Sequence, residues 1–141
     1  MAKELIISII IVVLIFIGNT ITENYTRESI DETTNNLESL REEIKKGEDE
    51  VDENIAKEKI DKIHEQWNSR YEKLAYYIEH DELEKVKTEL TGLRGYIEKE
   101  EYSEAIPELD KSVYILEHIT DKTALNLKKI FYKEGFGVVA P

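Results

Sequence analysis

The sequence predicts an all-α protein in which a single N-terminal transmembrane helix continues into a stalk, followed by an up-and-down antiparallel bundle of three to four helices. Residues 5–17 hold twelve strongly apolar residues interrupted only by Ser8, which favours a membrane helix. From residue 24 onward the chain is highly charged, and its apolar residues recur at spacings of three and four, as in amphipathic helices. These observations divide the chain into an anchor at 1–22, a stalk at 23–47, a bundle at 48–132 and a flexible tail at 133–141.

The apolar segment is expected to span the membrane from Leu5 to Thr22. Its twelve apolar residues favour insertion by about −4 to −7 kcal/mol in total, and a helix of this length rises about 27 Å, which spans a slightly thinned bilayer. Isoleucine and valine favour strands, but a lone strand would leave its backbone unpaired in hydrocarbon. The alternative is a cleavable signal peptide. The lack of a convincing Ala-x-Ala site and a positive region limited to Lys3 and the amino terminus favour an uncleaved anchor.

The orientation follows from the very short segment before the span. Such a segment favours an N-terminus that stays in the cytoplasm, so we expect a single-pass protein of the cell membrane with an extracytoplasmic body. The chain carries 31 acidic and 19 basic residues and a formal charge of −12. A nucleic-acid partner is therefore not expected, since phosphate binding needs a basic surface. Because cysteine is absent, disulfides, thiolate metal sites and cysteine nucleophiles are excluded.

The stalk and the first bundle helix each carry one apolar face. The stalk helix runs over 24–46 and ends at Gly47, and its sparse apolar seam suits a loose bundle or a coiled-coil pair, through which the chain could form an oligomer. That seam consists of Ile30, Leu37, Leu40 and Ile44. The second helix is expected to end near His80 and to be the main core helix. Its face holds Val51, Ile55, Ile60, Ile63, Trp67, Tyr71, Leu74 and Ile78.

Three further helices are expected. Asp81 can cap the third helix, with Glu84 at the third helical position as in a capping box, and this helix ends around 99–102. Ser103 or Glu104 begins a fourth helix, in which Pro107 is tolerated because it falls in or just after the first turn. A short fifth helix, capped by Thr120 or Asp121, runs through Leu125, Leu127, Ile130 and Phe131. Short connections between such helices make them antiparallel neighbours.

Two histidines and several carboxylates are the candidate metal ligands. In an up-down-up bundle the ends of the second and fourth helices meet, which could gather His80, Glu82, His118 and Asp121 around a metal ion. The competing interpretation is structural, because histidine near a helix C-terminus suits the helix dipole and aspartate caps the next helix. The stretch from His64 to Asn68 falls short of the zinc-protease motif, since Asn68 replaces the second histidine ligand. No cofactor and no catalytic residue are indicated.

Scattered positions along the chain resemble a family of small bacterial proteins known as domain of unknown function 4363. They comprise the apolar N-terminus, Trp67, the turn His80-Asp81-Glu82, Leu93 with Tyr96-Ile97, Leu116 with His118-Ile119, and the stretch from Leu125 to Phe131. Lys129 departs from the asparagine expected before Ile130. The resemblance implies a membrane-anchored helical protein of a Gram-positive, often clostridial, bacterium, without known catalytic residues. It also suggests a neighbouring membrane protein as partner.

An anchored body without a catalytic motif predicts a non-enzymatic function. We expect an acidic helical protein that serves as a protein interaction module or accessory subunit at the bacterial cell envelope, with the stalk or a bundle groove as its contact surface. The alternative is an extracytoplasmic helical bundle that senses a ligand or a metal ion.

Overall fold

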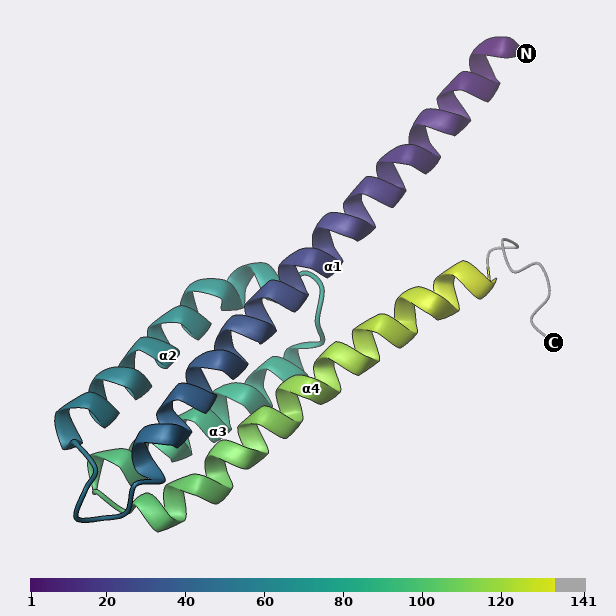
Figure 1. Ribbon diagram of the computed structural model, residues 1–141. Helices are drawn as coiled ribbons and strands as arrows, with labels where there is room; N and C mark the ends of the chain where they lie inside the picture. Colours follow the sequence, from purple (N-terminus) through teal and green to yellow (C-terminus); the bar gives the residue numbers. More distant parts are fainter. Residues whose placement is uncertain (134–141) are drawn as a thin grey trace.

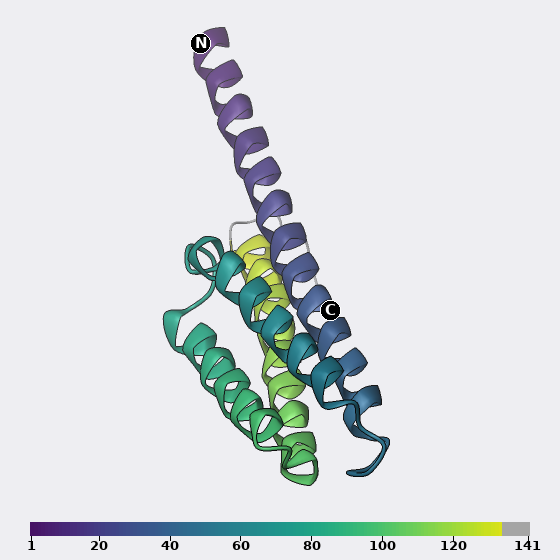
Figure 2. The same ribbon diagram turned by 90° about the vertical axis from the view of Figure 1, so that its left-hand side faces the viewer.

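A computed structural model describes residues 1–133, and the side chains of residues 1–124. This range contains four α-helices and no strand: α1 (Ala2–Ile44), α2 (Glu53–Leu74), α3 (His80–Glu98) and α4 (Tyr102–Lys133). The helices run alternately up and down, and each packs against its neighbours in the order α1, α2, α3, α4 and back to α1 (Figures 1 and 2). The all-α bundle with a long apolar N-terminal helix is thus confirmed. The predicted flexible tail lies outside the described residues, except for Lys133.

The N-terminal half of α1 projects from the bundle (Figure 1). We call the end of the bundle nearest this projection the proximal end; it contains the α2–α3 connection, residues 75–79. The opposite, distal end contains the α1–α2 connection, residues 45–52, and the α3–α4 connection, residues 99–101. Because the chain reverses at each connection, α4 runs back toward the side from which α1 projects.

The core is built from residues spaced three and four apart on every helix, the repeat of left-handed helix packing. Each helix therefore turns one narrow stripe inward while its charged residues stay in water. Trp67 is among the largest side chains that are fully buried, and it lies in the middle of α2. The fully buried apolar residues include Leu37, Leu40, Ile44, Ile60, Ile63, Leu74, Leu83, Leu90, Leu93, Ile97, Leu109 and Trp67.

The segment predicted as a stalk, 23–47, packs into the bundle. Its apolar seam is buried, with Thr33 filling the gap between Ile30 and Leu37, and Thr26 and Ser29 extend the seam toward the proximal end. The hydroxyls of Ser29 and Thr33 donate to the carbonyl oxygens of the preceding helical turn, at 2.7 and 2.8 Å, so they can be buried at low cost. Of the two predictions for this seam, a loose bundle or a coiled-coil pair, the structure has the bundle, since α2 and α4 of the same chain pack against α1.

Two helix boundaries differ from the prediction. His80 is the first residue of α3 instead of the end of α2, and Glu79 precedes it without a side-chain cap; Glu84 bonds to Tyr71, so no capping box forms. The expected fourth and fifth helices are one helix, α4. The hydroxyls of Thr120 and Thr123 donate back to the carbonyl oxygens of the preceding turn, an arrangement of a helix interior instead of a cap.

The C-terminus of α3 closes with a residue in the left-handed region. The backbone N–H of Glu100 donates to the carbonyl oxygen of Ile97 at 3.1 Å, and that of Glu101 to Tyr96 at 2.9 Å, the bonding pattern of a Schellman motif. Glu100 has φ of 59°, a conformation that costs least for glycine. The first helix instead ends just before Gly47, whose φ is 101°, as the sequence predicted.

Replacing Glu100 with glycine is expected to raise the Tm of the bundle by about 3–6 °C, because the left-handed residue loses its side-chain clash. The change also removes a carboxyl group whose pKa is raised by a hydrogen bond with the Glu53 carboxyl. Glu100→Gln is the matched control, since it removes the charge and keeps the side chain. Thermal unfolding followed by circular dichroism measures both variants. A glycine variant no more stable than the glutamine variant contradicts the backbone explanation.

Candidate functional site

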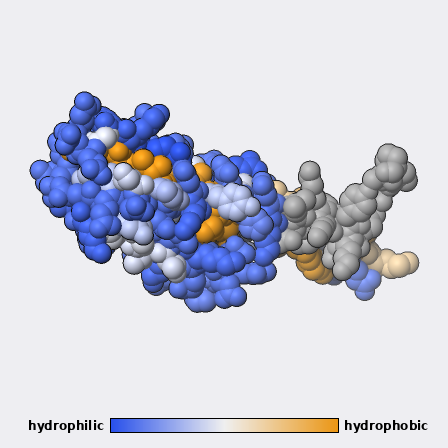
Figure 3. Space-filling view, turned by 90° about the horizontal axis from the view of Figure 1, so that it is seen from below, coloured by the Kyte–Doolittle hydropathy of each residue, from blue (hydrophilic) through white to orange (hydrophobic). Residues whose placement is uncertain are grey.

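The projecting half of α1 is apolar on all sides. Thirteen large apolar side chains between Leu5 and Ile21 are each 43–64% exposed. The helix is long and apolar enough to cross a membrane, and none of its apolar window is buried in the bundle. The bundle contrasts with it: seen from below, its surface is mostly hydrophilic, with a narrow run of apolar atoms (Figure 3). One N-terminal helix of this kind is compatible with a membrane anchor or a signal sequence.

Three hydroxyl groups of the projecting half are bonded within α1. The hydroxyl of Ser8 donates to the carbonyl oxygen of Glu4 at 2.9 Å, that of Thr20 to Phe16 at 3.0 Å and that of Thr22 to Gly18 at 2.8 Å. A hydroxyl bonded in this way costs little to remove from water. These three residues therefore do not oppose burial of the helix in hydrocarbon.

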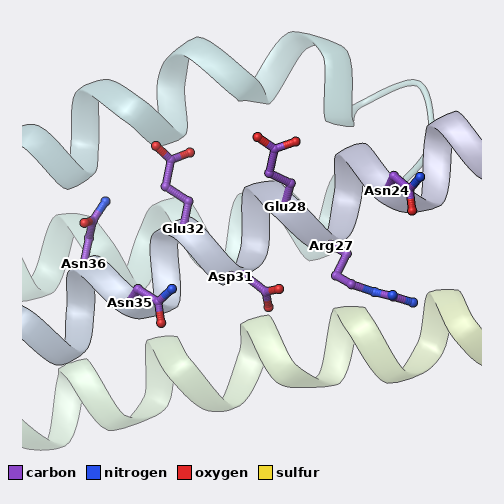
Figure 4. Close-up of a pocket in the computed structure, with 7 residues that line it drawn as sticks. All are labelled: Asn24, Arg27, Glu28, Asp31, Glu32, Asn35 and Asn36. Carbon is purple, nitrogen blue, oxygen red and sulfur yellow. The ribbon is translucent and has the colours of Figure 1, made fainter.

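Where α1 enters the bundle, it presents a polar surface to solvent between α2 and α4 (Figure 4). This surface, which we call the outward face, forms an open groove of about 580 Å³. Figure 4 shows the Glu28 and Glu32 side chains on the α2 side and Asp31 on the α4 side. The outward face comprises Asn24, Arg27, Glu28, Asp31, Glu32, Asn35 and Asn36.

One part of the outward face is bonded to α2. The Glu32 carboxylate pairs with Arg70 and accepts a hydrogen bond of 3.3 Å from the Gln66 amide, and Gln66 in turn accepts one from Asn36. Tyr25 reinforces this contact, because its ring lies 4.1 Å from the ammonium group of Lys73, a favourable cation–π arrangement. The α2 side of the outward face is therefore held in place.

The other part of the outward face faces solvent. The side chains of Glu28, Asp31 and Asn35 are exposed, and no hydrogen bond or ion pair joins them to any residue whose side chain the structure describes. Arg27 pairs with Glu23 at 2.8 Å. The sequence analysis proposed the stalk as a contact surface but did not identify these residues, although they hold a signal: asparagine is a poor helix former, and three asparagines lie in fewer than four turns of α1. The free acceptors can bind a complementary donor surface.

Of the candidate metal ligands, His80 lies in a network with α2. Its Nδ1 is 3.2 Å from the Tyr71 hydroxyl oxygen, and its Nε2 is 3.7 Å from a Glu84 carboxylate oxygen. The Tyr71 hydroxyl donates to Glu84, and this hydrogen bond raises the pKa of Tyr71 to about 12 and lowers that of Glu84. The imidazole thus has one partner on α2 and one on the next turn of its own helix, α3.

The other candidates do not join His80 around one centre. The proximal end does bring the start of α3 beside α4, but there Glu82 meets a cation: the Lys122 ammonium nitrogen lies 3.7 Å from Glu82 and 3.2 Å from Glu79. The hydrogen bond with Glu79 is the main reason that the pKa of Lys122 is raised. His118 and Asp121 are exposed on α4. Within the described residues, no group of three or more histidines and carboxylates is placed to hold a metal ion.

Comparison with protein families confirms the resemblance found in the sequence. A family model described as "Domain of unknown function (DUF4363)" matches residues 19–130. The comparisons with curated proteins and with solved structures return no match. The matched range contains the outward face and nearly all of the bundle, but it begins after most of the apolar segment.

Proposed function

We propose that this chain, which belongs to the DUF4363 family, is a non-enzymatic accessory protein anchored in the cell membrane by α1, and that its bundle binds another protein through the outward face. The N-terminus lies in the cytoplasm and the bundle outside it. The single observation that supports the anchor is the exposure of all thirteen large apolar side chains from Leu5 to Ile21, on a helix whose other half is fixed in a bundle core.

The membrane anchor is proposed because the bundle covers the apolar side chains of only one half of α1. In water the projecting half would expose a contiguous apolar surface along the whole segment, far beyond the patches usual on soluble proteins. The bundle has no described face to cover it, since its own helices bury their stripes against one another. A bilayer accepts such a helix because every backbone N–H after the first turn is bonded within it.

The outward face is the proposed contact for a protein partner. Its exposed carboxylates, Glu28 and Asp31, lie on a helix that the core holds rigidly, so they are presented without further ordering. Charges of this kind give an interface its specificity and its association rate. The partner expected from this chemistry presents arginine or lysine side chains. A neighbouring membrane protein fits, because the anchor keeps the outward face close to the membrane surface.

Photo-crosslinking in native membranes tests the proposal. A benzophenone amino acid at Asn35, on the outward face, is expected to give one discrete adduct with a second protein. The same residue at Thr88, exposed on α3 diagonally opposite α1, is the matched control and should give none. Reversing Glu28 and Asp31 to arginine should weaken the adduct at least tenfold, or about 1.4 kcal/mol.

Two outcomes contradict the proposal in different ways. A chain that emerges from mild detergent alone and monomeric, with equal labelling at both positions, refutes the protein contact. An intact mass that lacks the first residues shows instead a cleaved signal sequence, and the anchor is then wrong.

A further inference from the structure

The proximal end of the bundle carries exposed aromatic residues. Tyr76 is 84% exposed and Tyr77 is 40% exposed, both in the α2–α3 connection. Lys73, just before this connection, lies over Tyr25 near the start of the bundle part of α1, and Tyr77 lines a small cavity with Lys122 and Thr123 of α4. The tyrosines are therefore level with the point where α1 leaves the bundle.

The last turns of α4 extend past this level. A second small cavity is lined by Glu23, Thr26 and Arg27 of α1 and by Thr120, Thr123 and Ala124 of α4, which places these two stretches side by side. Helix α4 is antiparallel to α1 and continues for nine residues after Ala124, to Lys133, or about 14 Å. It therefore extends toward the side from which α1 projects, and Figure 1 shows its last turns diverging from α1.

The last part of α4 is basic, unlike the rest of the chain. Between Asp121 and Glu134 there is no acidic residue, whereas four are lysines: Lys122, Lys128, Lys129 and Lys133. Phe131 and Tyr132 stand within this stretch. The distal connections are acidic instead, with Glu48, Asp49, Glu50, Asp52, Glu100 and Glu101. An otherwise acidic chain thus places its basic, aromatic stretch at the end from which the anchor projects.

We propose that the proximal end rests on the bilayer surface, with Tyr76 and the last turns of α4 among anionic lipid headgroups. This inference rests on the proposed membrane anchor. Lysines near an anionic surface are attracted to it, and tyrosine favours the headgroup level of a membrane. A short helix that combines lysines with apolar and aromatic residues lies in that layer. The C-terminal end of α4 therefore gives the bundle a second point of attachment to the membrane, in addition to the membrane-spanning segment of α1.

Fluorescence in lipid nanodiscs tests this contact with the full chain. Because the chain has no cysteine, a single cysteine at Phe131 can carry an environment-sensitive NBD probe, with Leu14 as the reporter for the span and Glu50 as the distal control. In discs of phosphatidylcholine and phosphatidylglycerol, brominated lipid is expected to quench the probes at 131 and 14 and not the probe at 50. Reversing Lys128, Lys129 and Lys133 to glutamate should weaken docking roughly a hundredfold.

The outcomes separate the two proposals. If the probe at Leu14 is quenched and that at Phe131 behaves as the one at Glu50 does, the anchor holds and the headgroup contact is wrong. If the probe at Leu14 is not quenched, the anchor itself fails. Quenching at Phe131 that is equal in pure phosphatidylcholine and unaffected by the lysine reversals overturns the anionic-lipid contact.

Discussion

Lysine at both Ile10 and Val13 is expected to release the protein from the membrane. Lysine at the centre of a membrane helix costs roughly 2.5–3.5 kcal/mol, whereas isoleucine and valine favour insertion by about 0.3–0.6 kcal/mol each. The double substitution therefore shifts insertion by about 6–8 kcal/mol. This change is similar in size to the whole favourable free energy of insertion of the apolar segment, about 4–7 kcal/mol. Alkaline extraction of membranes, followed by detection of the protein in the soluble and pellet fractions, measures the effect.

The same variant distinguishes an anchor from a core element. Ile10 is 52% exposed and Val13 is 49% exposed, so the bundle should keep its Tm in the lysine variant. The matched control is leucine at both positions, which preserves apolarity and should stay in the pellet. A lysine variant that remains in the membrane contradicts the anchor. A large loss of Tm shows instead that the apolar segment packs against protein.

Truncation of Trp67 to alanine is expected to reduce the free energy of unfolding by about 3–5 kcal/mol. The indole is 1% exposed in the middle of α2, so alanine leaves a cavity that closely spaced helices can only partly close. The corresponding fall in Tm is roughly 10–20 °C for a bundle of this size. Thermal unfolding of the full chain in mild detergent, followed by circular dichroism, measures it.

Phenylalanine at position 67 is the sharper control. The indole nitrogen of Trp67 has no hydrogen-bond partner among the described residues. A phenyl ring in place of the indole therefore reduces the packed volume without breaking a hydrogen bond. We expect a loss of about 1–2 kcal/mol, smaller than that of the alanine variant because the cavity is smaller. A phenylalanine variant as unstable as the alanine variant is the result that refutes this account, because it points to an essential partner for the indole nitrogen.

The helices could be predicted because their signal is local. Spacings of three and four specify one face on each segment, and most side chains of these faces are buried. Ile55 is an exception, since it is 39% exposed and its neighbour Ala56 is buried instead. The pattern does not indicate which other helix each apolar face packs against. The thin seam before Gly47 suits packing against another chain as well as within its own bundle, and the polar residues Thr26 and Ser29 conceal how far it extends toward the N-terminus.

The boundaries and the site depend on contacts that a sequence does not display. Thr120 has the residue type of a helix cap, but its hydroxyl bonds back within α4, and both arrangements use the same side chain. Glu82 has the residue type of a metal ligand, yet its neighbour across the bundle is Lys122. Glu82 meets Lys122 because α3 packs beside α4. The two residues lie forty positions apart in the sequence.

The continuity of α1 has a mechanical consequence for an anchored chain. No proline interrupts the helix from Ala2 to Ile44, and Gly18 is its only glycine, so the span and the bundle tilt as one rod. From Thr22 to Ile44 this rod is about 33 Å long. A change of about 10° in tilt, of the kind that accommodates a thicker or thinner bilayer, then displaces the distal connections by about 6 Å. The distance that the acidic distal connections extend from the membrane therefore depends on the thickness of the bilayer.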